Sequence, residues 1–313
     1  NAFAQGSGGS WGSAQRELSE VLRAAQTNAA IQEIWVAAGA YQPLYDLGTT
    51  CTGNDLRDRT FRIRDGLKVY GGFAGTETAL TQRDLAMNST ILDGDIGAFG
   101  DTSDNAYHVV SVYNCSSGVT IDGFTIKNGV ATGAGAYVLS NPHASVQRSN
   151  GGGLWADLFS NVALRNIIFE NNMAISSSGL FMAGGTIDNC VFRNNLAYDR
   201  GGALSLFGNT NAANCTFSGN TALTTIVEVS APNARFVNCL FTGNYSTWNV
   251  NYSISPIGMI NTHGLGNNST WVNCVISGNY RNNASTSLVS IVAGQNNGNT
   301  HLRNCILCAN ADI

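Results

Sequence analysis

The sequence predicts an all-β protein folded as a parallel β-helix, a solenoid of stacked short strands that is closed at its start by one capping α-helix. Three observations predict this fold. A seven-residue phrase beginning with Asn returns at intervals of about two to three dozen residues, and such a period is typical of solenoids and related arrays. Each period contains short alternating apolar segments without helical periodicity. Asn and Gly recur where a coil must bend.

The repeated phrase is clearest at residues 189–195, which read Asn-Cys-Val-Phe-Arg-Asn-Asn. Cys190 and Phe192 alternate with Val191, so they share one face of a strand. The residue two places before the Asn is also apolar, and a straight strand cannot place it on that same face. A bend at the Asn resolves the conflict, because Asn tolerates a left-handed backbone. The second Asn, three residues after the Phe, predicts another bend.

Stacked coils would align the equivalent residues of successive phrases about 4.8 Å apart. Asn side chains can then hydrogen-bond along a column. The predicted structural ladder consists of Asn189, Cys190, Phe192, Asn214, Cys215, Phe217, Asn238, Cys239, Phe241, Asn273, Cys274, Asn304 and Cys305.

The eight cysteines do not predict a general disulfide framework. Five occupy the repeated inward position, where a spacing of about 4.8 Å exceeds the roughly 3.5–4.5 Å between the Cβ atoms of a disulfide. They are expected to be buried thiols that pack as small hydrophobes. A bridge between Cys51 and Cys115, both outside the column, stays an open alternative. The Cys305–Cys308 pair has the form CxxC but lacks the second pair that a zinc site needs.

Two motifs resemble a known family. Phe-x-x-Asn recurs at residues 169–172, 192–195, 217–220 and 241–244, and Gly-Gly-Ala-Leu occupies residues 201–204. These resemble the repeat motifs of the polymorphic outer membrane protein (Pmp) family of chlamydial type. Residues 34–41 and 66–75 resemble the opening of secreted bacterial β-helix proteins with the same repeats. The resemblance covers about residues 120–313. It implies a right-handed parallel β-helix, a location at the bacterial outer membrane or cell surface, and adhesion.

The start of the chain predicts the helix. Residues 14–29 carry an amphipathic stripe of Leu18, Val21, Leu22 and Ala25, and Ser13 is a candidate N-cap. An open solenoid end exposes core side chains and unpaired strand edges. The helix is therefore expected to close the N-terminal end.

Strands are expected at residues 34–36, 68–73, 90–95, 107–113 and 119–126, ahead of the regular coils. The sequence predicts a single domain over residues 1–313, with the cap and first coil in about 1–45 and the stacked coils in about 60–313. We expect the natural chain to continue past residue 313, into an anchoring or secretion segment.

Composition limits the function. Charged residues make up 12% of the chain and the net charge is −4. Nucleic acids and anionic membranes are both bound through basic patches. Because the chain has a net negative charge, neither is an expected partner. No apolar run reaches the length of a transmembrane helix.

The candidate binding residues are Tyr245, Trp248 and Tyr252, in an insertion between coils. Exposed aromatic rings can stack on sugars or insert into a partner surface. The alternative is that these rings fold back onto the wall of the coil.

The candidate metal residues are Asp93 and Asp95, with Asp101 and Asp104 nearby. They could bind calcium as a cofactor, or supply a pair of carboxylates for glycan chemistry. The alternative is that they are turn residues whose carboxylates accept backbone hydrogen bonds. No catalytic residue is assigned.

These observations lead to an expected function. The protein is expected to be a secreted or cell-surface adhesin or structural protein that presents loops to a host cell, a glycan or a partner surface, and it could assemble with other surface components. The alternative is a polysaccharide lyase or hydrolase, or a glycan-binding module, on the same β-helix. An enzyme should gather acids and a base in one groove, whereas the charged residues of the regular coils do not recur on one face.

Overall fold

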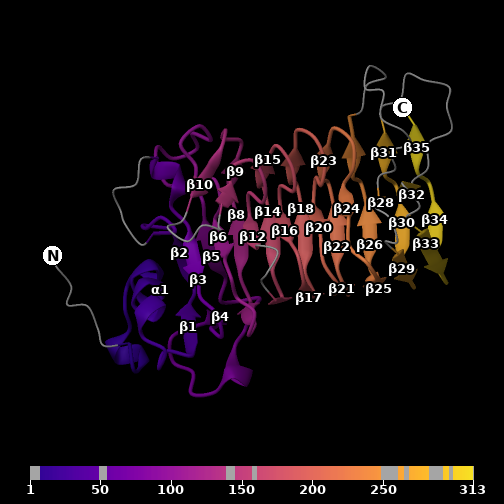
Figure 1. The fold of residues 1–313 in the computed structure, drawn as a ribbon. Coiled ribbons are helices and arrows are strands. Elements are labelled where there is room, and N and C mark those ends of the chain that lie inside the picture. Colours follow the sequence, from indigo (N-terminus) through magenta and orange to yellow (C-terminus); the bar gives the residue numbers. More distant parts are fainter. Residues whose placement is uncertain are drawn as a thin grey trace.

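The computed structural model describes residues 8–48, 55–138, 145–156, 161–247, 260–263, 268–281, 292–295 and 299–312. The chain winds into a parallel β-helix whose coils follow one another along a single axis (Figure 1). The predicted fold class is therefore confirmed. Within the described residues the strands form four parallel sheets, of nine, nine, seven and eight strands, and one antiparallel pair.

Each sheet collects the equivalent strands of successive coils. Sheet 1 contains β1 (Glu33–Ala37), β4 (Lys68–Phe73), β7 (Val119–Asp122), β13 (Val162–Arg165), β17 (Gly185–Asp188), β21 (Thr210–Ala213), β25 (Ala234–Val237), β29 (Asn268–Val272) and β33 (Asn299–Arg303). Sheet 2 contains β2 (Gly39–Tyr41), β5 (Thr90–Asp93), β8 (Thr125–Lys127), β14 (Ile168–Glu170), β18 (Val191–Arg193), β22 (Thr216–Ser218), β26 (Leu240–Thr242), β30 (Val275–Ser277) and β34 (Ile306–Cys308).

Sheet 3 contains β9 (Val130–Ala131), β15 (Met173–Ala174), β19 (Leu196–Ala197), β23 (Thr221–Ala222), β27 (Tyr245–Ser246), β31 (Tyr280–Arg281) and β35 (Ala311–Asp312). Sheet 4 contains β3 (Phe61–Ile63), β6 (Val110–Val112), β12 (Leu154–Ala156), β16 (Leu180–Met182), β20 (Leu204–Leu206), β24 (Val227–Val229), β28 (Ile260–His263) and β32 (Val292–Gln295). One regular coil thus runs through β21, β22, β23 and β24.

The first bend of each coil lies at the leading Asn, as expected. Asn166, Asn189, Asn214, Asn238, Asn273 and Asn304 all have φ between 51° and 56°. The second expected bend is also present, next to the second Asn. The left-handed residue there precedes the second Asn, with φ between 50° and 65° at Asn171, Asn194, Gly219, Gly243, Gly278 and Ala309. The second Asn itself is buried from coil to coil, at Asn172, Asn195, Asn220, Asn244 and Asn279.

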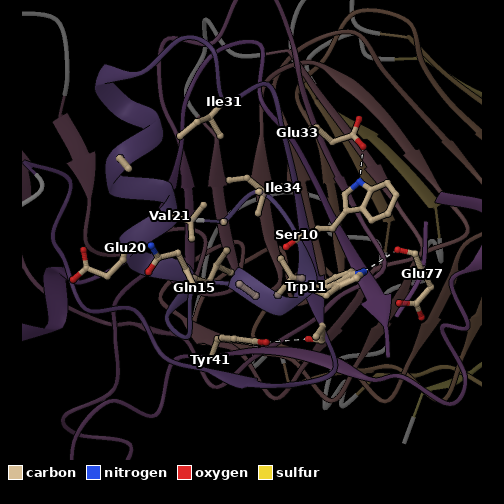
Figure 2. Close-up of a pocket in the computed structure, with 18 of the residues that line it drawn as sticks. Ser10, Trp11, Gln15, Glu20, Val21, Ile31, Glu33, Ile34, Tyr41 and Glu77 are labelled. Atoms are coloured by element: carbon tan, nitrogen blue, oxygen red, sulfur yellow. Dashed lines mark hydrogen bonds between the residues drawn. The ribbon is translucent and has the colours of Figure 1, made fainter. Parts of the chain in front are cut away.

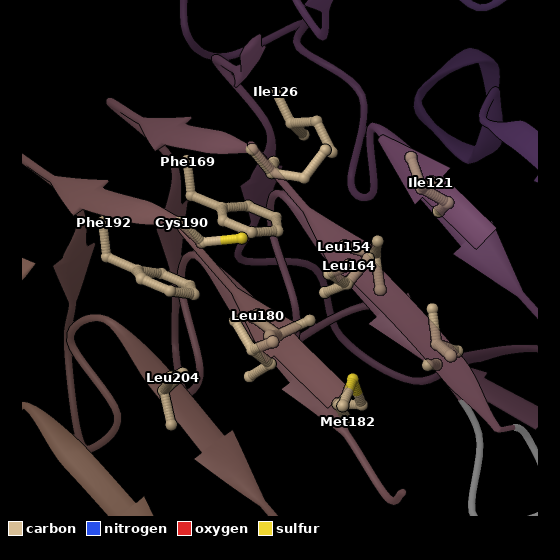
Figure 3. Packing of buried hydrophobic residues seen from close by; sticks show 14 of the residues in the cluster. Ile121, Ile126, Leu154, Leu164, Phe169, Leu180, Met182, Cys190, Phe192 and Leu204 are labelled. Carbon is tan, nitrogen blue, oxygen red and sulfur yellow. The ribbon is translucent and has the colours of Figure 1, made fainter. Parts of the chain in front are cut away.

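The core lies between the sheets and repeats with the coil (Figure 3). Phe169, Phe192, Phe217 and Phe241 occupy matching positions of four consecutive strands of sheet 2. Their ring centroids are 4.7, 4.9 and 4.3 Å apart, with the ring planes within 11° of parallel. Stacked rings bury large apolar areas, so each coil is stabilised by its two neighbours.

The helix begins later than the sequence indicated. α1 spans Leu18–Thr27, after a short 3-10 helix, η1 (Trp11–Ser13), and an extended Ala14. The residue at the N-cap is Glu17, and Ser13 therefore does not cap α1. The stripe of Leu18, Leu22 and Ala25 is buried in the main core, and α1 packs against β3. The helix thus covers the interior of the first coil (Figure 1).

Further segments lie outside the stack. The 3-10 helices η2 (Leu56–Asp58) and η3 (Leu80–Gln82) belong to connections in the first coils. The antiparallel strands β10 (Ala136–Val138) and β11 (Ser145–Gln147) bring Val146 against Leu47 and Trp155, which form a second small apolar cluster. In the part of the chain that the structure describes, no helix has the length and apolar character needed to cross a membrane.

Candidate functional site

A cavity of about 760 Å³ lies beside the first coil (Figure 2). Its walls come from residues 8–15, from α1, from β1 and from residues 76–78. This volume is within the roughly 300–1,000 Å³ usual for ligand pockets. Val21 of α1 and Ile34 of β1 line the same space as Trp11.

The cavity runs along the edge of β1. All five residues of this strand, Glu33–Ala37, line it. Successive side chains of a strand point to opposite faces, so a space that touches all five lies beside the strand. β1 is the terminal strand of sheet 1 and pairs with β4 on its other side. The cavity therefore faces a strand edge that has no strand partner in the described residues.

Two indoles form one wall. Trp35 points away from the coil core and stacks on Phe73, with the ring centroids 4.7 Å apart and the planes at 11°. The ring centroid of Trp11 lies 6.3 Å from that of Trp35 and 5.4 Å from that of Phe73. The Trp11 indole N–H donates to the backbone carbonyl of Glu77 at 2.9 Å, and the Trp35 indole N–H donates to the Glu33 carboxylate. Trp35 is thus fixed by stacking and a hydrogen bond, and Trp11 by tilted ring contacts and a hydrogen bond.

The charged lining is predominantly acidic. Among the described residues that line the cavity, Glu20, Glu33 and Glu77 are acidic and Arg23 is the one basic side chain. Donation by the backbone N–H of Ala74 and its neighbours lowers the pKa of Glu77. Hydrogen bonds from Tyr45 and Arg23 lower the pKa of Glu20. The lowered pKa values keep Glu20 and Glu77 ionised. Three acidic side chains against one basic side chain give the described lining two net negative charges near neutral pH.

The predicted aromatic binding residues are only partly described. Tyr245 lies in β27 of sheet 3, half-buried, and is in register with Thr221 and Tyr280. Trp248 and Tyr252 lie outside the described residues, as does most of the insertion that contains them. The structure does not bring Tyr245 near the cavity, which is formed at the other end of the stack.

Asp93 is occupied by protein contacts. Its Oδ2 lies 3.2 Å from the Lys127 ammonium, and its Oδ1 accepts from Asn128 Nδ2 at 2.7 Å and from the backbone N–H of Asp95 at 3.1 Å. Asp95 Oδ2 accepts from the backbone N–H of Gly100, whereas its buried Oδ1 has no hydrogen-bond partner in the described structure.

The contacts of Asp93 and Asp95 bear on the expectation that these residues bind calcium. The backbone contacts are those of turn residues, the alternative reading of this acidic segment. Over the described ranges, no group of three or more His, Cys, Asp and Glu side chains is placed to hold a metal ion.

The predicted ladder residues lie in columns. Asn189 Nδ2 donates to Asn166 Oδ1 at 2.7 Å, and the same contact joins Asn238 to Asn214 and Asn304 to Asn273. Cys190, Cys215, Cys239 and Cys274 are buried, whereas Cys305 is partly exposed. Each of these five thiols donates to the carbonyl two residues before it at 3.0–3.4 Å.

Three cysteines lie outside the column, and the sequence singled out each of them. Cys115 is buried, and its proposed partner Cys51 lies outside the described residues. Cys308, in the Cys305–Cys308 pair, is exposed in β34.

Sequence reasoning missed a buried polar network on the outer side of sheet 4. Glu228 is 2% exposed, accepts from the Ser205 hydroxyl at 2.8 Å and lies 3.3 Å from Arg200. Ser177 donates to Ser205 at 2.7 Å. The Glu228 carboxylate is thus paired with the Arg200 guanidinium and accepts a hydrogen bond, as a buried charge requires. Its contacts are those of a structural group that joins adjacent coils.

The cavity was also missed by sequence reasoning. The available signal was Trp11 and Trp35 on either side of the predicted helix, with Tyr41 after them. The first strand of a solenoid has no preceding coil, which marks β1 as an edge. Neither signal fixes how far α1 stands from β1, because that distance depends on tertiary packing.

Comparisons with protein-family models, with curated proteins and with solved structures find no match to this chain.

Proposed function

We propose that this protein is a secreted or cell-surface β-helical adhesin or structural protein of bacteria. It acts as a stiff rod that presents its insertions and its first coil to a host cell, a glycan or a partner surface. The Pmp-like motifs support the surface location.

One observation carries the proposal. The second Asn of successive phrases forms a buried ladder, in which the amides of Asn172, Asn195, Asn220, Asn244 and Asn279 each bond to the coil before and to the coil after. Asn220 illustrates it: its Nδ2 donates to Phe192 O at 2.8 Å and Asn244 Oδ1 at 2.9 Å, and its Oδ1 accepts from Asn195 at 2.9 Å. Removing any one amide would strand buried polar groups, so the coils are held in one register. Such a rod resists bending and suits projection from a surface.

The pairing of charges supports a non-enzymatic role over a glycan-active enzyme. A glycosidase needs two carboxylates about 5–10 Å apart across a substrate. In the described structure the partly buried acids Asp58, Asp93 and Asp122 each lie within 3.2 Å of a basic side chain. Their charges are committed to holding neighbouring segments.

A binding experiment tests the proposal. The full chain, labelled with a fluorophore, is titrated onto host cells and onto arrays of glycans and surface proteins, beside a variant without residues 248–256, which keeps β27. Saturable binding is expected. Phe99→Ala serves as the control, because Phe99 is fully exposed and lies outside the cavity. Release of sugar from polysaccharides by the same preparation, without saturable binding, would establish the enzyme alternative instead.

A further inference from the structure

We propose that the free edge of β1 is a strand-addition site, which binds an extended, apolar and positively charged segment of a partner polypeptide as a further strand of sheet 1. The inference deepens the proposed surface function and rests on it only for the presence of such a partner outside the cell.

The backbone of β1 supplies the first argument. Gln32 accepts from the Lys68 N–H at 3.1 Å, and Ile34 is in register with Val69. In a parallel pair, alternate residues point their N–H and C=O groups to opposite edges of the strand. Glu33 and Trp35 therefore direct theirs away from β4, into the cavity. No described residue bonds to these groups, so an added strand would find both donors and acceptors.

The position of α1 determines what can enter. The helix buries Leu18, Leu22 and Ala25 in the interior of the first coil, so another complete coil cannot stack there. The space of about 760 Å³ beside α1 and the β1 edge suits a single extended segment instead. The Tyr41 hydroxyl already occupies the Ala37 carbonyl at 3.1 Å, which limits pairing to the start of β1.

The two faces of the cavity set the side chains of the partner. On one face, Val21 and Ile31 remain partly exposed beside Ile34. On the other, Trp11 and Trp35 present fixed aromatic surface. Side chains of an added strand alternate between these faces, and both are apolar enough to bury aliphatic groups.

The charge of the cavity lining further restricts which residues the partner segment can carry. The two net negative charges of the lining favour Lys or Arg in the added segment and disfavour Asp or Glu. Arg and Lys can also lie over the indole faces of the same wall.

A synthetic peptide of alternating Val and Lys with blocked ends is the probe. It is titrated into the full chain while tryptophan fluorescence and amide hydrogen exchange are followed. Binding is expected to slow exchange of the Glu33 and Trp35 amides at least about tenfold, because they gain hydrogen bonds. A peptide of alternating Val and Glu is expected not to bind.

Backbone pairing is tested with two isomers of the probe, N-methylated on alternate amides in the two possible phases. One phase removes the donors that face β1 and should bind about tenfold more weakly, whereas the other should bind like the parent. Equal affinities for the two phases would overturn the proposal.

Variants test the site. Glu33→Gln, at an exposed residue, keeps an acceptor for the Trp35 indole and should weaken the Lys peptide about two- to fivefold. Trp35→Ala should weaken it further, and Phe99→Ala should have no effect.

The outcomes separate the site from the wider function. Peptide binding without cell binding would support the site and refute the adhesive function. Strand addition would be refuted if the chain bound cells while the β1 amides stayed unprotected from hydrogen exchange. Displacement of the peptide by a neutral oligosaccharide would refute it as well.

Discussion

The buried Asn ladder gives the sharpest test of the fold's energetics. Asn220 is fully buried, and its side chain makes four hydrogen bonds, to Phe192, to Asn244 and twice to Asn195, at 2.8–3.1 Å. Asn220→Ala removes all four while leaving the backbone of the bend unchanged, because the left-handed residue is Gly219.

The magnitude follows from the groups left behind. In Asn220→Ala the backbone N–H of Asn195 and one N–H of its amide lose their acceptor in a water-free interior. Each stranded buried group costs about 1–3 kcal/mol, so the free energy of unfolding should fall by about 2–6 kcal/mol. Asn244 Oδ1 still accepts from the backbone N–H of residue 220, so it adds little.

Asn214→Gly is the matched control. Asn214 belongs to the exposed ladder and has φ of 56°, which Gly adopts without strain. Its partner Asp188 can turn to water, so a change below about 1 kcal/mol is expected. Urea unfolding followed by circular dichroism measures both variants, with an unchanged slope as the sign that the coils still unfold together. Equal losses in the two variants would refute the assignment of the buried ladder as the main polar support of the coils.

Three further predictions concern single residues. Ala309 adopts φ of 50° at a corner where other coils place Gly or Asn, so Ala309→Gly should raise the free energy of unfolding by about 1 kcal/mol in urea titrations. Hydrogen bonding to the neighbouring Cys215 thiol and burial raise the pKa of the Cys239 thiol to about 12, so iodoacetamide should label exposed Cys308 in the folded protein and Cys239 only after unfolding, as read by peptide mass mapping. Burial lowers the pKa of His108 to about 4, below the roughly 6.5 of an unfolded chain. Its contribution to stability is therefore complete above pH 6.5 and falls by up to about 3 kcal/mol as the pH drops towards 4, a slope that His108→Asn should remove.

The repeat made the stack predictable. Once Cys190 and Phe192 are taken as inward-facing, the bend at Asn189 follows from strand alternation alone, and the structure has it at φ of 51°. The second corner was predicted less well. The sequence shows Asn194 and Asn195 side by side, and nothing local decides which one bends and which one turns inward. The stacking of coils decides, because the amide of Asn195 reaches both Asn172 and Asn220 only from the inside.

The first coil lies outside the reach of the repeat. The amphipathic stripe of the helix was visible, but its start at Leu18 depends on the turn that places Trp11 against Phe73. That contact joins residues more than sixty positions apart, and no periodicity encodes it. The cavity beside β1 is a consequence of the same long-range packing. Sequence reasoning therefore placed its candidate aromatic residues in an insertion, although the structure also gathers Trp11 and Trp35 at the first strand.

The ladder explains why binding should be sought at the start of the stack and in the insertions. A regular coil cannot change shape without breaking amide bonds to both neighbours, and these bonds are buried. A ligand that binds to such a wall can contact only the side chains that already point outward from it. β1 differs, since its inward face is covered by α1 while the backbone groups of its outer edge have no partner among the described residues. A sheet that grows by adding parallel strands has at this edge the same hydrogen-bonding pattern that joins its own coils. Recognition there needs no new geometry from the protein, because the partner supplies the next strand of a series that the fold has already begun.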